Sequence, residues 1–410
     1  MSRADFPIFN AHPELIYLDS AATTQKPQAV VDALSSFYSK SYATVHRGVY
    51  PMGERATELY EGARAYVAEF LGAKSADEVV FLRNATEALN LVAEAWGRPN
   101  LGPKDRIVTT IMEHHSNFLP WQRLARQTGA ELVVLPVTGN GQLDMEAARR
   151  ELQAGASVLA VTMVSNVLGT VNPIACLAAM AHAQGAVVVV DGAQAVAHRP
   201  VNVTQMEADF FVFSGHKAYA PTGIGVLWGR SELLAQMEPF LVGGEMVNSV
   251  SLKKTTFLDP PHRFEAGTPA VAEAIALKGA LEYIKNIGFD SILGQEAALL
   301  ELLLTGLGQI PGVSILGPEG HLREGLVSFL MDGVHPHDIS GFLGEKGIAV
   351  RAGFHCAQPL HEALGIPATV RASIGIYNTE DDVRTFLRGL EDARALFTGE
   401  RQWTTSTASR

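Results

Sequence analysis

The chain has 410 residues, of which 47% are hydrophobic and 18% are charged, and this apolar content is enough for a large core spread over two or three domain-sized units. Its formal net charge of −11 argues against a nucleic-acid-binding surface, which would require clustered lysines and arginines. Two cysteines in so long a chain exclude a disulfide framework and indicate a reducing, cytoplasmic environment.

The N-terminal segment carries no pattern of a secretion signal. Asp5, Pro7 and Pro13 interrupt the apolar stretch that a signal peptide would need. A second uncharged stretch, 152–181, is broken by polar residues and by Pro173. We therefore expect buried strands and a helix there, and we predict no association with a membrane.

Between residues 78 and 229, short apolar runs alternate with amphipathic helical patterns such as 85–96 and 173–185. The runs consist mainly of Val, Ile and Leu without polar alternation, which is typical of strands buried on both faces. They cover residues 78–82, 106–111, 131–137, 157–164, 186–191, 210–213 and 223–228. This alternation predicts an α/β domain with a mainly parallel, seven-stranded sheet.

Two helical patterns, 270–288 and 289–308, come next in the chain. Shorter patterns of strands and helices then cover 326–333, 336–346, 348–353 and 370–377. A last helix begins after Thr379, which together with Asp382 matches an N-cap with an acidic third position. These elements predict a second, smaller α+β domain.

The predicted elements divide the chain into four parts. An N-terminal segment, 1–25, joins the small domain, and a large α/β domain covers 26–285. The small α+β domain covers 286–397, and a polar tail, 398–410, is expected to be flexible.

The clearest chemical signal lies at the ends of two neighbouring predicted strands. Asp191 ends the strand 186–191, where α/β sheets place their ligand sites, and Lys217 follows the strand 210–213. A carboxylate and a lysine placed in this way suit pyridoxal phosphate, because the acid can pair with the pyridine nitrogen and the amine can form a Schiff base. Nearby residues that could contact the ring or phosphate are Gln194, Ser214 and His216. The alternative is an ordinary turn aspartate and a solvated lysine.

The strand 78–82 leads into Ala85 and Thr86 at the start of a helix. A helix N-terminus presents free N–H groups that suit a phosphate, and Thr86 adds a hydroxyl. An ordinary helix N-cap is the alternative.

Two further strand ends carry polar side chains. His114 and His115 follow the strand 106–111, and one of them could stack on a cofactor ring and move protons. Asn166 follows the strand 157–164 and could contact the ring or the substrate.

Cys356 lies between Gly353 and Pro359 and is predicted to be on a flexible loop, where a thiol could act as a nucleophile. His355 and Arg351 are candidates for lowering its pKa. Arg371 is a good candidate for binding a carboxylate, because guanidinium forms two parallel hydrogen bonds with it. By contrast, Cys176 lies in the apolar helical pattern ACLAAMA and is predicted to be an inert core thiol.

These motifs resemble those of the class V, fold type I pyridoxal-phosphate enzymes, and specifically of the Suf-type (group II) cysteine desulfurases. The resemblance covers the whole chain except the tail, and it is carried by the segments IYLDSAATTQKP (16–27), VHRGVYPMGERAT (45–57), NATEALNLVA (84–93), MEHHSNFLPWQ (112–122), DGAQAVAH (191–198), SGHK (214–217), RFEAGTP (263–269), RAGFHCAQP (351–359) and VRASIGIYNT (370–379).

The resemblance implies a fold type I transferase that converts L-cysteine to L-alanine with a persulfide on Cys356. It implies that Lys217 forms the Schiff base, that Asp191 pairs with the pyridine nitrogen, that Gln194 contacts the ring oxygen, and that His114 stacks on the ring. The phosphate ligands that it implies are Ala85, Thr86, Ser214, His216 and, from the other subunit of a homodimer, Thr268. The substrate residues that it implies are Asn166 and Arg371, with Arg351 and Arg47 nearby. No resident metal is implied.

The persulfide sulfur is expected to pass to an acceptor protein of a Suf-type system for iron–sulfur cluster assembly. His335 and His337 could help to dock a metal-bearing acceptor, since imidazole is a common zinc ligand. The chain departs from many relatives by having Phe354 where they have a histidine. Selenocysteine lyase activity, another class V reaction and a non-catalytic cofactor-binding scaffold remain as alternatives.

Overall fold

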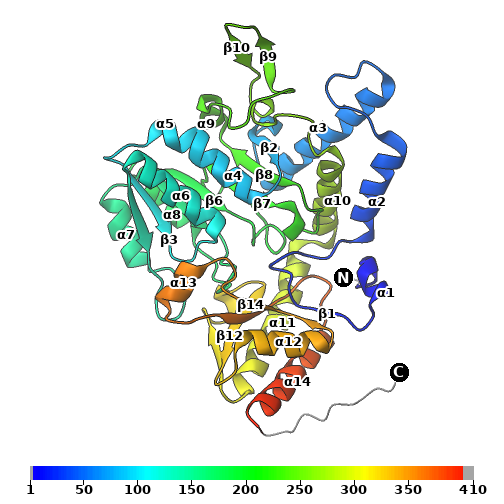
Figure 1. The fold of residues 1–410 in the computed structure, drawn as a ribbon, viewed down its shortest axis with the longest axis vertical. Coiled ribbons are helices and arrows are strands. Elements are labelled where there is room, and N and C mark those ends of the chain that lie inside the picture. Colours follow the sequence, from blue (N-terminus) through cyan, green and yellow to red (C-terminus); the bar gives the residue numbers. More distant parts are fainter. Residues whose placement is uncertain (1–2, 400–410) are drawn as a thin grey trace.

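The computed structural model describes residues 3–399 (Figure 1). The tail that the sequence predicts to be flexible, 398–410, lies outside the described residues except for its first two positions. None of the described helices is both long and apolar enough to cross a bilayer.

A seven-stranded sheet forms the centre of the larger part of the molecule, with the strand order β2-β8-β7-β6-β5-β3-β4. Only the pairings of β8 with β2 and with β7 are antiparallel. The strands are β2 (Val79–Leu82), β3 (Arg106–Thr110), β4 (Glu131–Leu135), β5 (Val158–Thr162), β6 (Val187–Asp191), β7 (Phe210–Ser214) and β8 (Gly225–Gly229). The prediction of a mainly parallel sheet is therefore confirmed, since each of the seven apolar runs forms one of its strands.

Helices cover both faces of this sheet, which explains why its strands lack polar alternation. In β6, Val188 and Val190 pack into the core on one face, whereas Val189 packs into the core on the other. One face is covered by α3 (Pro51–Leu71), α7 (Met145–Gln153), α8 (Ile174–His182) and α10 (Val271–Ile287). The opposite face is covered by α4 (Ala85–Leu91), its π-helical continuation Val92–Gly97 and α6 (His115–Thr128).

Cys176 is not the core thiol that the sequence predicts. It lies on α8 but is exposed, because the helix turns Leu177, Ala178 and Ala181 towards the sheet instead. The prediction was wrong because every residue of this helix except His182 is apolar, so the sequence pattern does not show which face is buried.

A four-stranded antiparallel sheet with the order β11-β12-β15-β14 forms the second part of the structure. Its strands are β11 (Val313–Leu316), β12 (Leu326–Met331), β14 (Arg351–Gly353) and β15 (Thr369–Ser373). It packs with α11 (Phe289–Gln309), α12 (Pro336–Glu345) and α14 (Glu380–Phe397), which share a core built around Leu303, Phe329 and Phe386.

The N-terminal segment is attached to this second part. Strand β1 (Ile16–Tyr17) pairs in parallel with β13 (Ile348–Ala349), and Asp19 forms an isolated bridge with Ser373. These pairings join the N-terminal segment to strands within 286–397, whereas the division into a large domain, 26–285, and a small domain, 286–397, stays a prediction.

The remaining elements are short and lie around these two parts. They are α1 (Pro7–Ala11), α2 (Gln28–Ser36), α5 (Arg98–Asn100), α9 (Ser231–Gln236), α13 (Gln358–Ala363) and the hairpin of β9 (Val247–Val250) and β10 (Thr255–Phe257), which projects from the large domain (Figure 1).

The N-cap at Thr379 that the sequence predicts is present at the start of α14, where it forms a capping box with Asp382, and it gives a first test. The Asp382 N–H donates to Thr379 Oγ1 at 3.3 Å, and the Thr379 N–H donates to Asp382 Oδ2 at 3.2 Å. We expect Thr379→Ala to lower the free energy of unfolding by about 1 kcal/mol in urea denaturation, because an N–H of the first turn loses its acceptor. Thr385→Ala, within the same helix, is the control and should change the free energy of unfolding by less than half as much. Equal effects of the two substitutions would contradict the capping role of Thr379.

Candidate active site

A cavity of about 310 Å³ lies at the carboxyl ends of β5, β6 and β7, the edge at which open α/β sheets bind their ligands. Residues from the start of α4 and from β14 and β15 of the small sheet complete its wall. The predicted site residues that line it are Ala85, Thr86, His114, Asn166, Asp191, Gln194, Ser214, His216, Lys217, Arg351, Cys356 and Arg371. Arg47 and Thr268 lie outside it.

Lys217 and Asp191 stand at the ends of adjacent strands. Asp191 is the last residue of β6, and Lys217 ends the 3₁₀ turn that follows β7. Burial lowers the pKa of Lys217 to about 8, although the charge of Asp191 opposes this shift. Within residues 3–399, no hydrogen-bond or ion-pair partner contacts the Lys217 ammonium, so this amine is available to a ligand.

Two hydrogen bonds fix the acidic end of the cavity. The Ala193 N–H donates to Asp191 Oδ1 at 2.9 Å, and burial raises the pKa of this carboxyl while Ala193 and Lys217 oppose the rise. Gln194 Nε2 donates to the Ala21 carbonyl at 2.8 Å. The side chains of Asp191 and Gln194 are therefore held in place before any ligand binds.

Hydroxyl groups gather beside the first turn of α4. The Ala85 N–H donates to Ser214 Oγ at 2.9 Å, so it is not the free donor that the helix N-terminus suggested, and Ser214 keeps its own O–H for a ligand. Asn84 Oδ1 accepts from the Glu87 N–H, and Thr86 Oγ1 lies 2.6 Å from Ser116 Oγ. Ser214, Thr86 and Ser116 thus form a cluster of neutral donors that suits a phosphate.

His216 is the second side chain of the turn after β7 that reaches the cavity. Its Nδ1 lies 3.1 Å from Thr23 Oγ1, and its carbonyl accepts from Lys26 Nζ at 2.8 Å. Burial, aided by the charges of Lys217 and Lys26, lowers the pKa of His216 to about 4. The ring is therefore neutral at pH 7.

His114 lies in the cavity wall as a neutral imidazole. The Ser116 N–H donates to His114 Nδ1 at 3.1 Å, which places the ring proton on Nε2. Burial and the charges of Lys217, His115 and Arg371 lower its pKa to about 3, so it does not titrate near neutral pH as the sequence suggested. A neutral imidazole suits stacking on an aromatic ring. The only proton that the His114 imidazole could donate is the one on Nε2.

The loop that carries Cys356 is tied to the large domain. The Cys356 carbonyl accepts from the His115 N–H at 2.7 Å, and the His355 carbonyl accepts from Asn166 Nδ2 at 2.7 Å. His355 and Cys356 have φ values of 52° and 56°, in the left-handed region that non-glycine residues seldom adopt. The thiol is exposed, but these contacts oppose the flexibility that the sequence suggested for its loop.

His355 does not supply the positive charge that we expected beside the thiol. Its ring is buried against Thr369, with Nε2 at 2.9 Å from Thr369 Oγ1. Burial and the nearby charges of Arg371 and Arg351 lower its pKa to about 2, so it is uncharged at pH 7. That part of the prediction is wrong, because burial removes the charge on which it depended.

Arg371 and Arg351 converge on one carboxylate, Asp19. Arg351 Nη2 donates to Asp19 Oδ2 at 2.9 Å, and Arg371 Nη2 lies 3.4 Å from Asp19 Oδ1. Arg371 Nη1 donates to the Asn166 carbonyl at 2.8 Å, whereas its buried Nε has no hydrogen-bond partner among residues 3–399. The Arg371 guanidinium is thus fixed on two sides and keeps one unpaired donor.

Sequence reasoning missed Asp19, Thr23, Ser116 and Thr162. Asp19 holds both arginines, and the other three line the cavity. Asp19 and Thr23 lie in the motif IYLDSAATT, and Ser116 directly follows the two histidines, so the motifs contained the signal. The roles of Asp19 and Thr23 depend on contacts across more than 100 residues, such as that of Thr23 with His216.

Several known proteins are similar to this chain in sequence and in structure. The family model Aminotransferase class-V matches residues 16–386. The chain belongs to the aminotransferase class-V family. Its similar relatives include a probable cysteine desulfurase of Halobacterium salinarum, 47% identical over 96% of each chain. Among solved structures, a cysteine desulfurase from Thermococcus onnurineus matches with a TM-score of 0.92 and 43% identity over 96% of this chain and 98% of that one. The cysteine desulfurase CsdA from Escherichia coli matches with a TM-score of 0.89 and 41% identity over 96% and 97%.

The lowered pKa of Lys217 gives a test in the cofactor-free protein. A protonated amine does not react with acetic anhydride, so the labelling rate of Lys217 should rise as the pH passes through about 8, rather than through the value of about 10.4 for free lysine. Trace labelling with mass spectrometry of the Lys217 peptide measures this midpoint. Asp191→Asn should lower this midpoint further, because the substitution removes the carboxylate that favours the charged form of the Lys217 amine. A midpoint near that of free lysine, or one raised by Asp191→Asn, would contradict the assignment.

Proposed function

We propose that the chain is a pyridoxal-phosphate-dependent cysteine desulfurase that converts L-cysteine to L-alanine and forms a persulfide on Cys356. The observation that carries the proposal is that Lys217 and Cys356, from different domains, line one cavity. They lie close enough for the charge of a Cys356 thiolate to favour the ammonium form of Lys217. A transaminase or a binding scaffold has no need for an exposed thiol at this place. The cysteine desulfurases among the relatives support the same activity.

The cavity residues fit pyridoxal phosphate. Lys217 offers an unpartnered amine, and Asp191 offers an adjacent buried carboxylate. Thr86, Ser214 and His216 offer donors for the phosphate, and neutral His114 offers a face for stacking. When bound, this cofactor supplies an aldehyde that condenses with amines and a ring that withdraws electrons from the α-carbon of the substrate.

Arg371 would hold the carboxylate of the substrate. Arg371 lines the cavity, and its guanidinium offers the donors that a carboxylate needs. Asp19 and the Asn166 carbonyl fix the guanidinium from the other side, and Asn166 also binds the loop of Cys356. The substrate carboxylate and the thiol loop are thereby tied to the same asparagine.

Lys217 and Cys356 would then carry out two different tasks. The amine of Lys217 removes the proton from the α-carbon, which its lowered pKa of about 8 makes possible near neutral pH. The Cys356 thiolate attacks the substrate sulfur and forms the S–S bond of the persulfide, while the C–S bond of the substrate breaks. The electron pair of that bond stays on the substrate carbon, which takes up a proton to become the methyl group, and the α-carbon regains a proton to give alanine.

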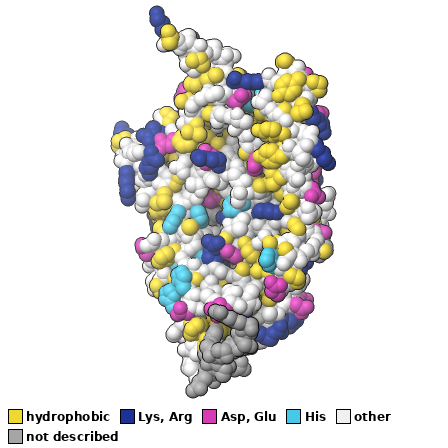
Figure 2. Space-filling model, turned by 45° about the vertical axis from the view of Figure 1, so that its right-hand side comes forward, with side chains coloured by type: hydrophobic (Ala, Val, Ile, Leu, Met, Phe, Trp, Pro, Cys, Tyr) yellow, Lys and Arg dark blue, Asp and Glu magenta, His cyan; other side chains and the backbone are white. Residues whose placement is uncertain are grey.

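Thr268 and Arg47 would act in a homodimer. Thr268 is exposed in a hollow whose wall includes the half-exposed apolar side chains of Tyr38, Tyr42 and Leu241. Figure 2 shows apolar side chains gathered in the upper half of one face. An exposed apolar surface of this kind suits a partner subunit, and from there Thr268 would reach the phosphate of the other chain.

The sulfur would leave through an acceptor protein of a Suf-type system, for iron–sulfur cluster assembly in the cytoplasm. His335 and His337 are exposed at the start of α12, and their rings stack with centroids 5.2 Å apart. His335 Nδ1 accepts from the His337 N–H, so His335 caps the helix, while the ring of His337 remains available to a metal of the acceptor.

The two cysteines provide a matched test of the activity. Cys356→Ala should keep its bound cofactor and its yellow colour but lose alanine formation from cysteine by at least about a hundredfold, because the sulfur has no receiving thiol. Cys176→Ala removes the other exposed thiol and should keep the parent rate. The measurement is alanine produced from L-cysteine, run in parallel with L-selenocysteine. If Cys356→Ala turned cysteine over at the parent rate, the role of this thiol would be excluded.

The acceptor proposal has a separate test. His337→Ala should lower the stimulation of turnover by a zinc-bearing Suf-type acceptor and leave the rate without acceptor unchanged. His321→Ala, which removes another exposed histidine of the small domain, is the control. Unchanged stimulation in His337→Ala would rule out docking through this ring.

A further inference from the structure

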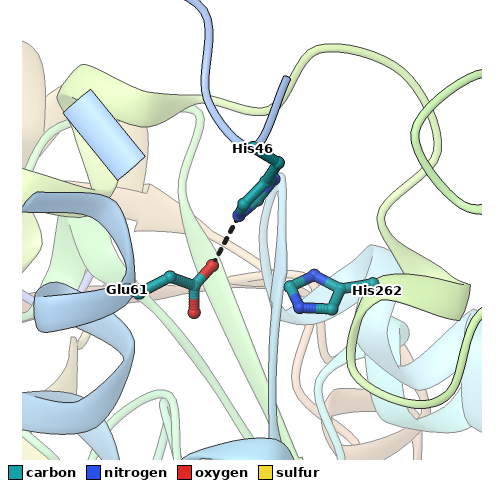
Figure 3. Close-up of side chains that lie close together, drawn as sticks. All are labelled: His46, Glu61 and His262. Atoms are coloured by element: carbon teal, nitrogen blue, oxygen red, sulfur yellow. Dashed lines mark hydrogen bonds and ion pairs between the residues drawn. The ribbon is translucent and has the colours of Figure 1, made fainter. Parts of the chain in front are cut away.

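Three potential metal ligands converge at a place that shares no residue with the active-site cavity. His46 lies in the loop before α3, Glu61 lies on α3, and His262 begins the 3₁₀ turn His262–Phe264 (Figure 3). One ligand atom from each residue lies within 4.8 Å of those of the other two. The sequence predicted no metal here, because the three residues are far apart in the chain.

The backbone of His46 is held in an unfavourable conformation that directs its ring to this point. Its φ is 64°, in the left-handed region, and its N–H donates to Thr57 Oγ1 at 2.8 Å. Its Nε2 lies 2.8 Å from Glu61 Oε1. Backbone strain of this kind concentrates at functional sites, where the surrounding structure enforces it.

The carboxylate of Glu61 is oriented from behind by Arg64. Arg64 Nε donates to Glu61 Oε2 at 2.8 Å and Arg64 Nη2 donates to Oε1 at 3.3 Å, and Oε1 also lies 2.8 Å from His46 Nε2. The charge of Arg64 is offset by buried Glu265, whose Oε1 accepts from Arg64 Nη1 at 2.6 Å. Glu61, Glu265 and Arg64 together therefore carry a net charge of −1, which favours the binding of a cation beside Glu61.

His262 completes the cluster, and there is open space beside it. Its ring centroid is 5.1 Å from that of His46. A cavity of about 160 Å³ is lined by both histidines and by Glu245, which pairs with Arg47. This volume provides room for a water molecule as a further ligand.

We propose that His46, Glu61 and His262 bind a zinc ion, with water in the fourth position. Two imidazoles and one carboxylate form a ligand set that zinc prefers, and tetrahedral bonds of about 2.0 Å place ligand atoms about 3.3 Å apart. The three atoms reach this spacing by small side-chain rotations, since the farthest two are now no more than 4.8 Å apart. When the metal binds Nε2, the single ring proton of His46 lies on Nδ1, so that His46 binds as a neutral imidazole. The site ties the loop next to Arg47 to α3.

Zinc content tests the site directly. The cofactor-loaded protein is incubated with Zn²⁺, dialysed against metal-free buffer and analysed by elemental mass spectrometry. We expect about one zinc per chain in the parent protein and a loss of at least about tenfold in zinc affinity in His262→Ala and Glu61→Gln. His262→Gln serves as a second variant, and cofactor absorbance confirms that each variant is folded.

The control variants exclude other zinc ligands of the chain. Cys356→Ala removes the active-site thiol, and the double variant His335→Ala/His337→Ala removes the exposed histidine pair; both should keep the parent zinc content. X-ray absorption of the bound zinc should show only nitrogen and oxygen ligands with imidazole scattering. Absence of zinc from the parent protein, full zinc content in His262→Ala and His262→Gln, or sulfur in the ligand shell would each overturn the proposal. None of these results bears on desulfurase activity.

Discussion

The burial of Lys217 next to Asp191 is the physical constraint on which the chemistry depends. An amine removed from water loses part of its preference for the charged form, and a neighbouring carboxylate restores some of it. The balance gives a lysine that exchanges protons close to neutral pH. This balance exists because β6 and β7 are adjacent and parallel, so that their carboxyl ends bring both groups to the same edge of the sheet.

The small domain adds what the large sheet lacks: a carboxylate-binding arginine and a thiol. Arg371 and Cys356 belong to the small domain, yet hydrogen bonds to Asn166 and His115 bring both into the large domain's cavity. Asp19 of the N-terminal segment holds Arg371 and Arg351 and so joins this segment to the neighbouring strands β14 and β15. The site therefore depends on how the domains pack as well as on the sheet itself.

The sequence predicted those features that local patterns determine. Runs of Val, Ile and Leu identified all seven strands of the large sheet, and polar residues at their ends identified most of the cavity wall. Features that depend on packing could not be predicted in this way. The neutral state of His355 follows from burial against Thr369, and the role of Asp19 follows from its pairing with Ser373, 354 positions later in the chain. The exposure of Cys176 depends on how α8 is rotated, which a helix whose residues are all apolar except His182 does not reveal.

In the proposed reaction a sulfur atom moves from cysteine to the thiol that shares a cavity with Lys217. This transfer can be followed by mass spectrometry of the cofactor-loaded protein after brief reaction with sulfur-34-labelled L-cysteine. The peptide with Cys356 should gain the mass of one labelled sulfur atom, while the peptide with Cys176 should stay unchanged. Labelled sulfur on Cys176 instead, or alanine formation without labelled sulfur on either cysteine, would contradict the proposed reaction.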